Sequence, residues 1–101
     1  MSHQKNTNFI LGDWSPFKPL TEEDNIVWNE VKKSFDHFDK PYEVSKKILD
    51  GMKYRFRCTS KIYGYIIVEV NGRFNRNKIF DVMNISISQV MILLINIISM
   101  I

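Results

Sequence analysis

Apolar and basic side chains alternate over one short segment of the chain, Lys53-Tyr54-Arg55-Phe56-Arg57-Cys58-Thr59. Successive side chains of a β-strand point to opposite faces of a sheet, so this period of two predicts a strand. We expect Tyr54, Phe56 and Cys58 to face a core, and the three basic side chains to face solvent. The segment therefore predicts a sheet that is covered on one face only.

Similar alternation on both sides of this segment predicts three more strands, at residues 42–48, 65–70 and 78–88. Asp50-Gly51 and Asn71-Gly72 are strong turn signals, and Tyr63-Gly64 interrupts the pattern between them. Strands that follow one another through short turns form an antiparallel meander. In a meander the first and third turns lie at one end of the sheet, and the second lies at the other.

A helix is predicted before these strands, over residues 21–38. Thr21 is a suitable N-cap, Asp24 occupies the capping-box position, and Pro41 cannot continue a helix. Apolar residues then recur on one helical stripe, at Trp28, Val31, Phe35 and Phe38. We expect this stripe to pack on the apolar face of the sheet.

The fold class predicted from these elements is α+β, with one long helix packed on a four-stranded antiparallel meander. The 101 residues allow one domain, which we place at residues 1–88 with an extended arm at 1–20. Residues 89–101 form an uncharged, apolar tail. This tail has three interpretations: a strand extension, a weak membrane anchor and a segment outside the native domain. We favour a poorly specified apolar extension.

Little in the sequence suggests catalysis. With one Cys the chain can form neither an internal disulfide nor a zinc ribbon, and Cys58 falls on the apolar face of its strand. No phosphate-binding loop or metal-ligand spacing occurs in the sequence. We therefore expect a cytoplasmic monomer that has no catalytic residues, no cofactor and no metal. A role at a membrane is not expected, although the apolar run at 90–101 leaves it open.

The basic strand face offers one alternative function. Residues 41–81 hold nine Lys or Arg and four acids, a modest excess of positive charge. Interleaved aromatic residues on a basic sheet can stack on single-stranded nucleic acid. We do not expect nucleic acid to be the partner, because the aromatic residues of this strand alternate to the opposite face.

Three segments share their order and character with one known family. They are Ile10-Leu11-Gly12-Asp13-Trp14-Ser15-Pro16, Pro19-Leu20-Thr21-Glu22-Glu23-Asp24 and Lys47-Ile48-Leu49-Asp50-Gly51-Met52-Lys53-Tyr54-Arg55-Phe56. The chain resembles the cystatin superfamily over about residues 9–88, and in particular its stefin-like members, which lack disulfides. Gly51 matches the last residue of the family's Gln-Val-Val-Ala-Gly loop, while Lys47 and Asp50 differ in polarity.

The resemblance implies a reversible inhibitor of papain-like cysteine proteases, which blocks the active-site cleft with a wedge made of the arm and two hairpin loops. The residues that this implies at the contact come from the arm, the first loop and the second loop: Ile10, Leu11, Gly12, Lys47, Ile48, Leu49, Asp50, Gly51, Arg73 and Phe74. Phe74 is expected at the apolar tip of the second loop. A cystatin-like domain that binds proteins without inhibiting proteases is the alternative.

Overall fold

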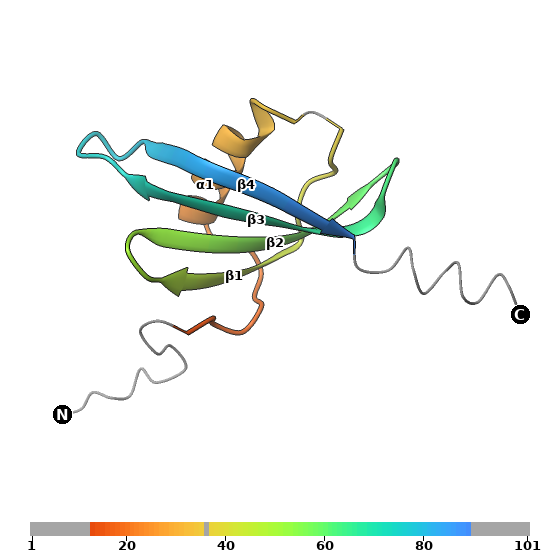
Figure 1. The fold of residues 1–101 in the computed structure, drawn as a ribbon, viewed down its shortest axis with the longest axis horizontal. Helices are drawn as coiled ribbons and strands as arrows, with labels where there is room; N and C mark the ends of the chain where they lie inside the picture. The colour runs from red at the N-terminus through yellow and green to blue at the C-terminus, as the bar shows by residue number, and fades with distance from the viewer. Residues whose placement is uncertain (1–12, 36, 90–101) are drawn as a thin grey trace, which may run out of the picture.

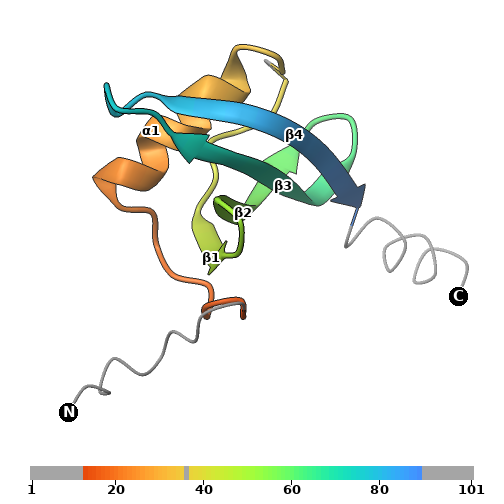
Figure 2. The ribbon, with the colours of Figure 1, turned by 60° about the vertical axis from the view of Figure 1, so that its left-hand side comes forward.

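The computed structural model describes residues 13–35 and 37–89. Within these residues the elements are α1 (Glu22–Lys32), β1 (Glu43–Ile48), β2 (Met52–Ser60), β3 (Gly64–Phe74) and β4 (Phe80–Gln89). The strands form one antiparallel sheet in the order β1-β2-β3-β4, and α1 lies against one face of it (Figures 1 and 2). The predicted α+β class and meander order are confirmed.

Helix α1 begins where the sequence predicts. The Asp24 backbone N–H donates to the Thr21 hydroxyl at 3.3 Å, and the Thr21 backbone N–H donates to Asp24 Oδ2 at 2.8 Å. This capping box satisfies two backbone donors that the first helical turn would otherwise leave unpaired. Asp24 Oδ1 also accepts from Lys46 Nζ at 2.9 Å, so the buried carboxylate joins the helix start to β1.

The helix ends earlier than predicted, at Lys32 rather than near residue 38. The backbone N–H of Lys33 donates to the carbonyls of Glu30 and Val31, which tightens the last turn. Phe38 still reaches the core, but it does so through an isolated bridge to Ser60 at the end of β2. The helix therefore ends nine residues before Pro41, and the proline does not terminate it.

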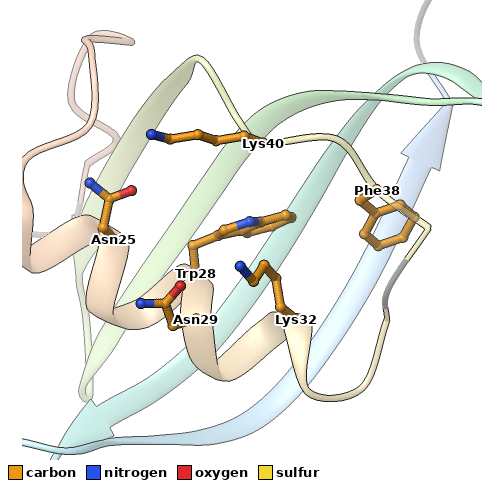
Figure 3. Close-up of a pocket in the computed structure, with 6 residues that line it drawn as sticks. All are labelled: Asn25, Trp28, Asn29, Lys32, Phe38 and Lys40. Carbon is orange, nitrogen blue, oxygen red and sulfur yellow. The ribbon is translucent and has the colours of Figure 1, made fainter.

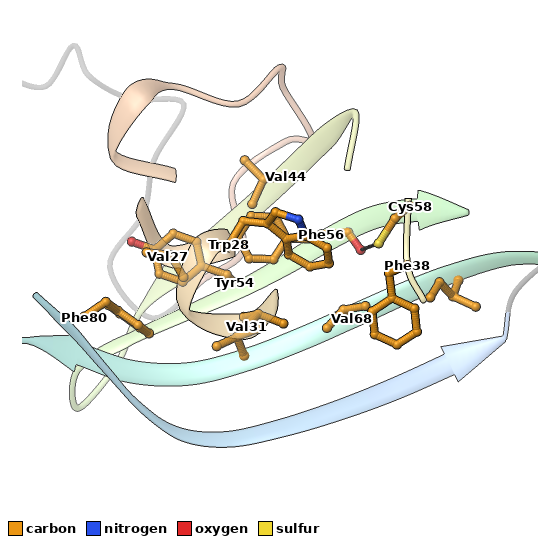
Figure 4. Close-up of a cluster of buried hydrophobic side chains, with 12 residues drawn as sticks. Val27, Trp28, Val31, Phe38, Val44, Tyr54, Phe56, Cys58, Val68 and Phe80 are labelled. Atoms are coloured by element: carbon orange, nitrogen blue, oxygen red, sulfur yellow. Dashed lines mark hydrogen bonds between the residues drawn. The ribbon is translucent and has the colours of Figure 1, made fainter. Parts of the chain in front are cut away.

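The core lies between α1 and the sheet (Figure 4). Its buried apolar members are Val27, Trp28, Val31, Phe38, Val44, Tyr54, Phe56, Cys58, Ile66, Val68, Val70 and Phe80. The Trp28 and Phe56 rings lie 5.1 Å apart between centroids, and Phe56 stacks on Tyr54 at 5.6 Å. The predicted inward face of β2 is confirmed.

Burial also sets the chemistry of the single thiol. Cys58 is fully buried, and desolvation, with a smaller contribution from the charge of Asp39, raises the pKa of this thiol to about 12. A thiol with this pKa stays protonated at neutral pH, and only the thiolate is a good nucleophile. Cys58 is a core residue, as its place in the alternation predicts.

The third turn differs from the prediction. Asn71-Gly72 does not turn the chain, because β3 continues to Phe74. Asn71 pairs with Asn84 while Gly72 pairs with Val82, so the ladder has a bulge in β4 at the intervening residue. The bulge allows residues on both sides of it, including Phe80 and Ile85, to pack on the same core.

The arm adds a short fifth segment beside β1. Lys18 and Val44 exchange two backbone hydrogen bonds, at 3.0 and 2.8 Å, and the Ser15 N–H donates to the Lys46 carbonyl at 2.8 Å. The Ser45 hydroxyl, which is buried, donates to the Ser15 carbonyl. The described part of the predicted arm, residues 13–20, is therefore extended and pairs antiparallel with the edge of the sheet.

Candidate functional site

Both hairpin loops lie at one end of the sheet, as the meander predicts. Residues 49–51 join β1 to β2, and residues 75–79 join β3 to β4. Figure 1 shows these two loops at one end and the β2–β3 turn at the other. We call the end formed by residues 48–51 and 75–79 the loop edge.

The first loop is a tight turn with apolar side chains exposed at its tip. Ile48 pairs with Met52, and the Leu49 N–H donates to the Gly51 carbonyl at 3.1 Å. Asp50 and Gly51 have φ angles of 53° and 106°, a region that favours Gly and tolerates Asp. Ile48 is 38% exposed and Leu49 49% exposed, so the loop presents aliphatic surface to solvent.

Of the predicted first-loop residues, Lys47 behaves differently from the others. Its ammonium lies 5.5 Å from the centre of the Trp14 ring, on the sheet face opposite α1. A cation over an indole face is attracted by the ring quadrupole. Lys47 therefore contacts the arm, while the residues that follow it form the loop edge.

The second loop is formed by residues 75–79, which follow the predicted contact residues Arg73 and Phe74. Phe74 lies at the end of β3, where it is partly buried and packs edge-on against Phe80, with 5.1 Å between ring centroids. The placement of Phe74 at the loop tip is therefore wrong, because β3 is longer than predicted. Asn75 closes the loop through its side-chain oxygen, which accepts from the Asn77 and Ile79 N–H groups. Ile79 is 49% exposed and is the apolar residue of this loop.

Arg73 links the two hairpins instead of projecting from the second. Its guanidinium donates to the Asp50 carbonyl at 3.4 Å and lies 3.5 Å from the Asp50 carboxylate. The pair is solvent-exposed, so its contribution to the free energy of unfolding is small. Its geometric effect is to hold the first loop beside the end of β3.

The described part of the arm leads toward the loop edge. Lys18 lies beside Val44 and Ser15 beside Lys46, so the arm, followed back toward its start, runs along β1 in the direction of Ile48. The predicted contact residues Ile10, Leu11 and Gly12 lie outside the described residues. Their role at the site stays a prediction.

The basic face of β2 is covered more than the sequence suggests. The Arg55 guanidinium lies 3.9 Å from the Trp14 ring centre, and Arg57 lies 3.8 Å from that of Phe17. Arg55 also pairs with Glu69 at 3.1 Å, and Arg57 pairs with an acid of β1 at 2.9 Å. The expectation of a freely solvated basic face is wrong, because the arm lies over it. These contacts disfavour the nucleic-acid alternative, because the arginines of β2 already pack on the aromatic rings of the arm.

No family model, curated protein or solved structure matches this chain. The resemblance to the cystatin superfamily therefore stays a prediction, which rests on the segments quoted above. Across residues 13–35 and 37–89, no helix is long and apolar enough to span a membrane. The same residues include no group of three His, Cys, Asp or Glu side chains placed to hold a metal ion.

Proposed function

We propose that this chain is a reversible inhibitor of papain-like cysteine proteases with a cystatin-like fold. The observation that carries the proposal is the loop edge, where two hairpin loops lie side by side and the arm runs toward them. Such an edge has the shape of a wedge that enters a cleft. The proposed contacts are the first loop, the second loop and the arm residues Ile10, Leu11 and Gly12.

The first loop supplies the apolar contact. Ile48 and Leu49 are about half exposed, and burying them in a cleft removes aliphatic surface from water. The turn is already held by Gly51, by its own hydrogen bond and by Arg73, so little conformational entropy is lost on binding. The loop blocks the catalytic thiol without offering it a scissile carbonyl, and the chain is therefore not cut.

The second loop supplies charge as well as an apolar side chain. Arg76, Lys78 and Ile79 are all exposed there. Two cations at the rim of a contact accelerate encounter with an acidic surface, and this effect weakens as salt rises. A target protease with acidic groups beside its cleft fits this loop best.

Replacing Leu49 by Asp should weaken inhibition of papain at least tenfold, about 1.4 kcal/mol in binding free energy. The variant would bury an unpaired carboxylate at the contact, which is unfavourable. Leu49 is exposed in the free protein, so the folded domain should be unaffected. Inhibition constants from papain titrations measure the difference.

Ile62→Asp is the matched control for Leu49→Asp. Ile62 is 63% exposed and lies in the turn between β2 and β3, at the opposite end of the sheet. The same change of chemistry at this position should leave inhibition unchanged. Equal effects of the two substitutions, or an effect of Ile62→Asp alone, would contradict the assignment of the loop edge as the contact surface.

A further inference from the structure

A pocket of about 390 Å³ opens between α1 and the segment that leads to β1 (Figure 3). The residues that line it are Asn25, Trp28, Asn29 and Lys32 from α1 and Phe38 and Lys40 from that segment. None of these residues belongs to the loop edge. The volume lies within the range of small-molecule sites.

The polar groups of this pocket are predominantly hydrogen-bond donors, and two of them are cations. Lys32 and Lys40 make no ion pair with any residue of the described chain. No carboxylate occurs among the described lining residues. The described acids that are next to lining residues in the sequence all have other partners: Asp39 accepts from the Thr59 hydroxyl at 2.7 Å, Glu30 pairs with Lys33 at 3.0 Å, and Asp24 pairs with Lys46 at 2.9 Å. The described lining of the pocket therefore carries a net positive charge and is open to an anion.

Trp28 provides a second, independent observation. Its side chain is 2% exposed, and its indole N–H has no hydrogen-bond partner within the part of the chain that the structure describes. Figure 3 shows the indole among the other lining side chains, with its nitrogen edge turned toward the side where Lys40 lies. Buried donors are nearly always paired, so an unpaired one beside a pocket points to an acceptor that the pocket receives.

The apolar walls limit the shape of the ligand. The Trp28 and Phe38 rings lie 6.4 Å apart between centroids, tilted by 35°, and both line the pocket. We propose that this pocket binds a small aromatic carboxylate. The carboxylate accepts from the Lys32 and Lys40 ammonium groups and from the Trp28 indole N–H, and the flat ring packs against Trp28 and Phe38. This binding site is independent of the protease-inhibitor proposal.

Benzoate is the probe that tests the site, with the full-length chain observed by NMR at constant ionic strength. The chain has two Trp residues, so a Trp14→Phe background leaves the Trp28 indole N–H as the only signal of its kind. Benzoate should shift this signal in a saturable manner. Benzamide has the same shape without the charge, and it should bind at least tenfold more weakly.

Charge variants show whether the shift reports this pocket. Lys32→Gln and Lys40→Gln should each weaken benzoate binding at least about fivefold. Lys33→Gln is the matched control, since Lys33 neighbours Lys32 on the chain but pairs with Glu30 at 3.0 Å and does not line the pocket. The absence of a saturable shift, equal binding of benzamide, or equal weakening by Lys33→Gln would each overturn the proposal.

Discussion

Replacing Gly72 by valine is expected to destabilise the domain by about 3 kcal/mol or more, which is the upper range for overpacking a core. A Cβ at this position would lie 2.2 Å from the Asp81 carbonyl oxygen and 2.6 Å from the Phe80 ring. The carbonyl belongs to the backbone of the neighbouring strand and cannot rotate away as a flexible side chain would. Relief therefore requires β3 and β4 to separate, together with displacement of Phe80, which is 1% exposed.

Urea denaturation of the full chain, followed by circular dichroism, measures the loss. Asn71→Ala is the matched control, because Asn71 precedes Gly72 in β3 but already carries a Cβ. That change removes one hydrogen bond from Lys53 and should cost about 1 kcal/mol or less. If Gly72→Val proved no more destabilising than Asn71→Ala, the close packing of β4 against Gly72 would be wrong.

Replacing Asp24 by alanine is expected to cost about 2–4 kcal/mol, the combined effect of losing the carboxylate half of the capping box and a charged hydrogen bond to Lys46. The Asp24 side chain is 1% exposed, and its two oxygens accept from the Thr21 N–H and from Lys46 Nζ. Without it, the Thr21 backbone N–H loses its acceptor and the partly buried Lys46 loses its partner, whereas the Thr21 hydroxyl can still accept from the backbone N–H of residue 24. Removing one member of a buried pair is costly because the other charge stays behind.

Asp24→Asn separates the two contributions. The amide oxygen can still accept from Thr21, but the group no longer neutralises Lys46, so this variant should be intermediate in stability. Glu22→Ala is the control, since Glu22 is an exposed acid in the same helical turn and should cost less than about 1 kcal/mol. Thermal unfolding of the three variants should rank Asp24→Ala lowest, and equal stability of all three would refute the role of Asp24.

The sequence predicts the elements of this fold well where alternation or capping is strong. Tyr54, Phe56 and Cys58 are all buried on one face, and the capping box of Thr21 and Asp24 starts the helix. The pattern of apolar residues did not predict where the helix ends. Phe35 and Phe38 continue the helical spacing, yet the chain turns after Lys32 and both rings still pack on the core. The spacing of apolar residues indicates which side chains are buried. It does not show whether the backbone that carries them is helical.

Asn71-Gly72 illustrates the same limit in the sheet. This dipeptide is a turn signal, but here its glycine provides room for the ring of Phe80 across the ladder. The distinction depends on which side chain of the neighbouring strand packs over the glycine, and a single sequence does not show that neighbour. The error shortened β3 in the prediction and moved Phe74 from a packed strand end to a loop tip.

The candidate site likewise has a part that the sequence predicts and a part that it does not. The first loop could be predicted because Asp50-Gly51 stands between two alternating runs, and Ile48 and Leu49 are exposed there. The second loop was misplaced along with Gly72, and Ile79 was missed, although the polar run before it marks the turn. The stacking of Trp14 and Phe17 on the basic face joins segments about 40 residues apart, which local periodicity does not detect.

Titration of papain of known active-site concentration with the purified full-length chain tests the inhibitor proposal most directly. We predict a stoichiometric loss of protease activity that is reversed on dilution, with the chain recovered uncut. Recovery of protease activity on dilution, together with an intact chain, distinguishes a wedge-type inhibitor from a competing substrate. A substrate would be cleaved at the loop edge. Full protease activity at inhibitor concentrations up to about 10 µM, or cleavage of the chain during inhibition, would contradict the inhibitor proposal.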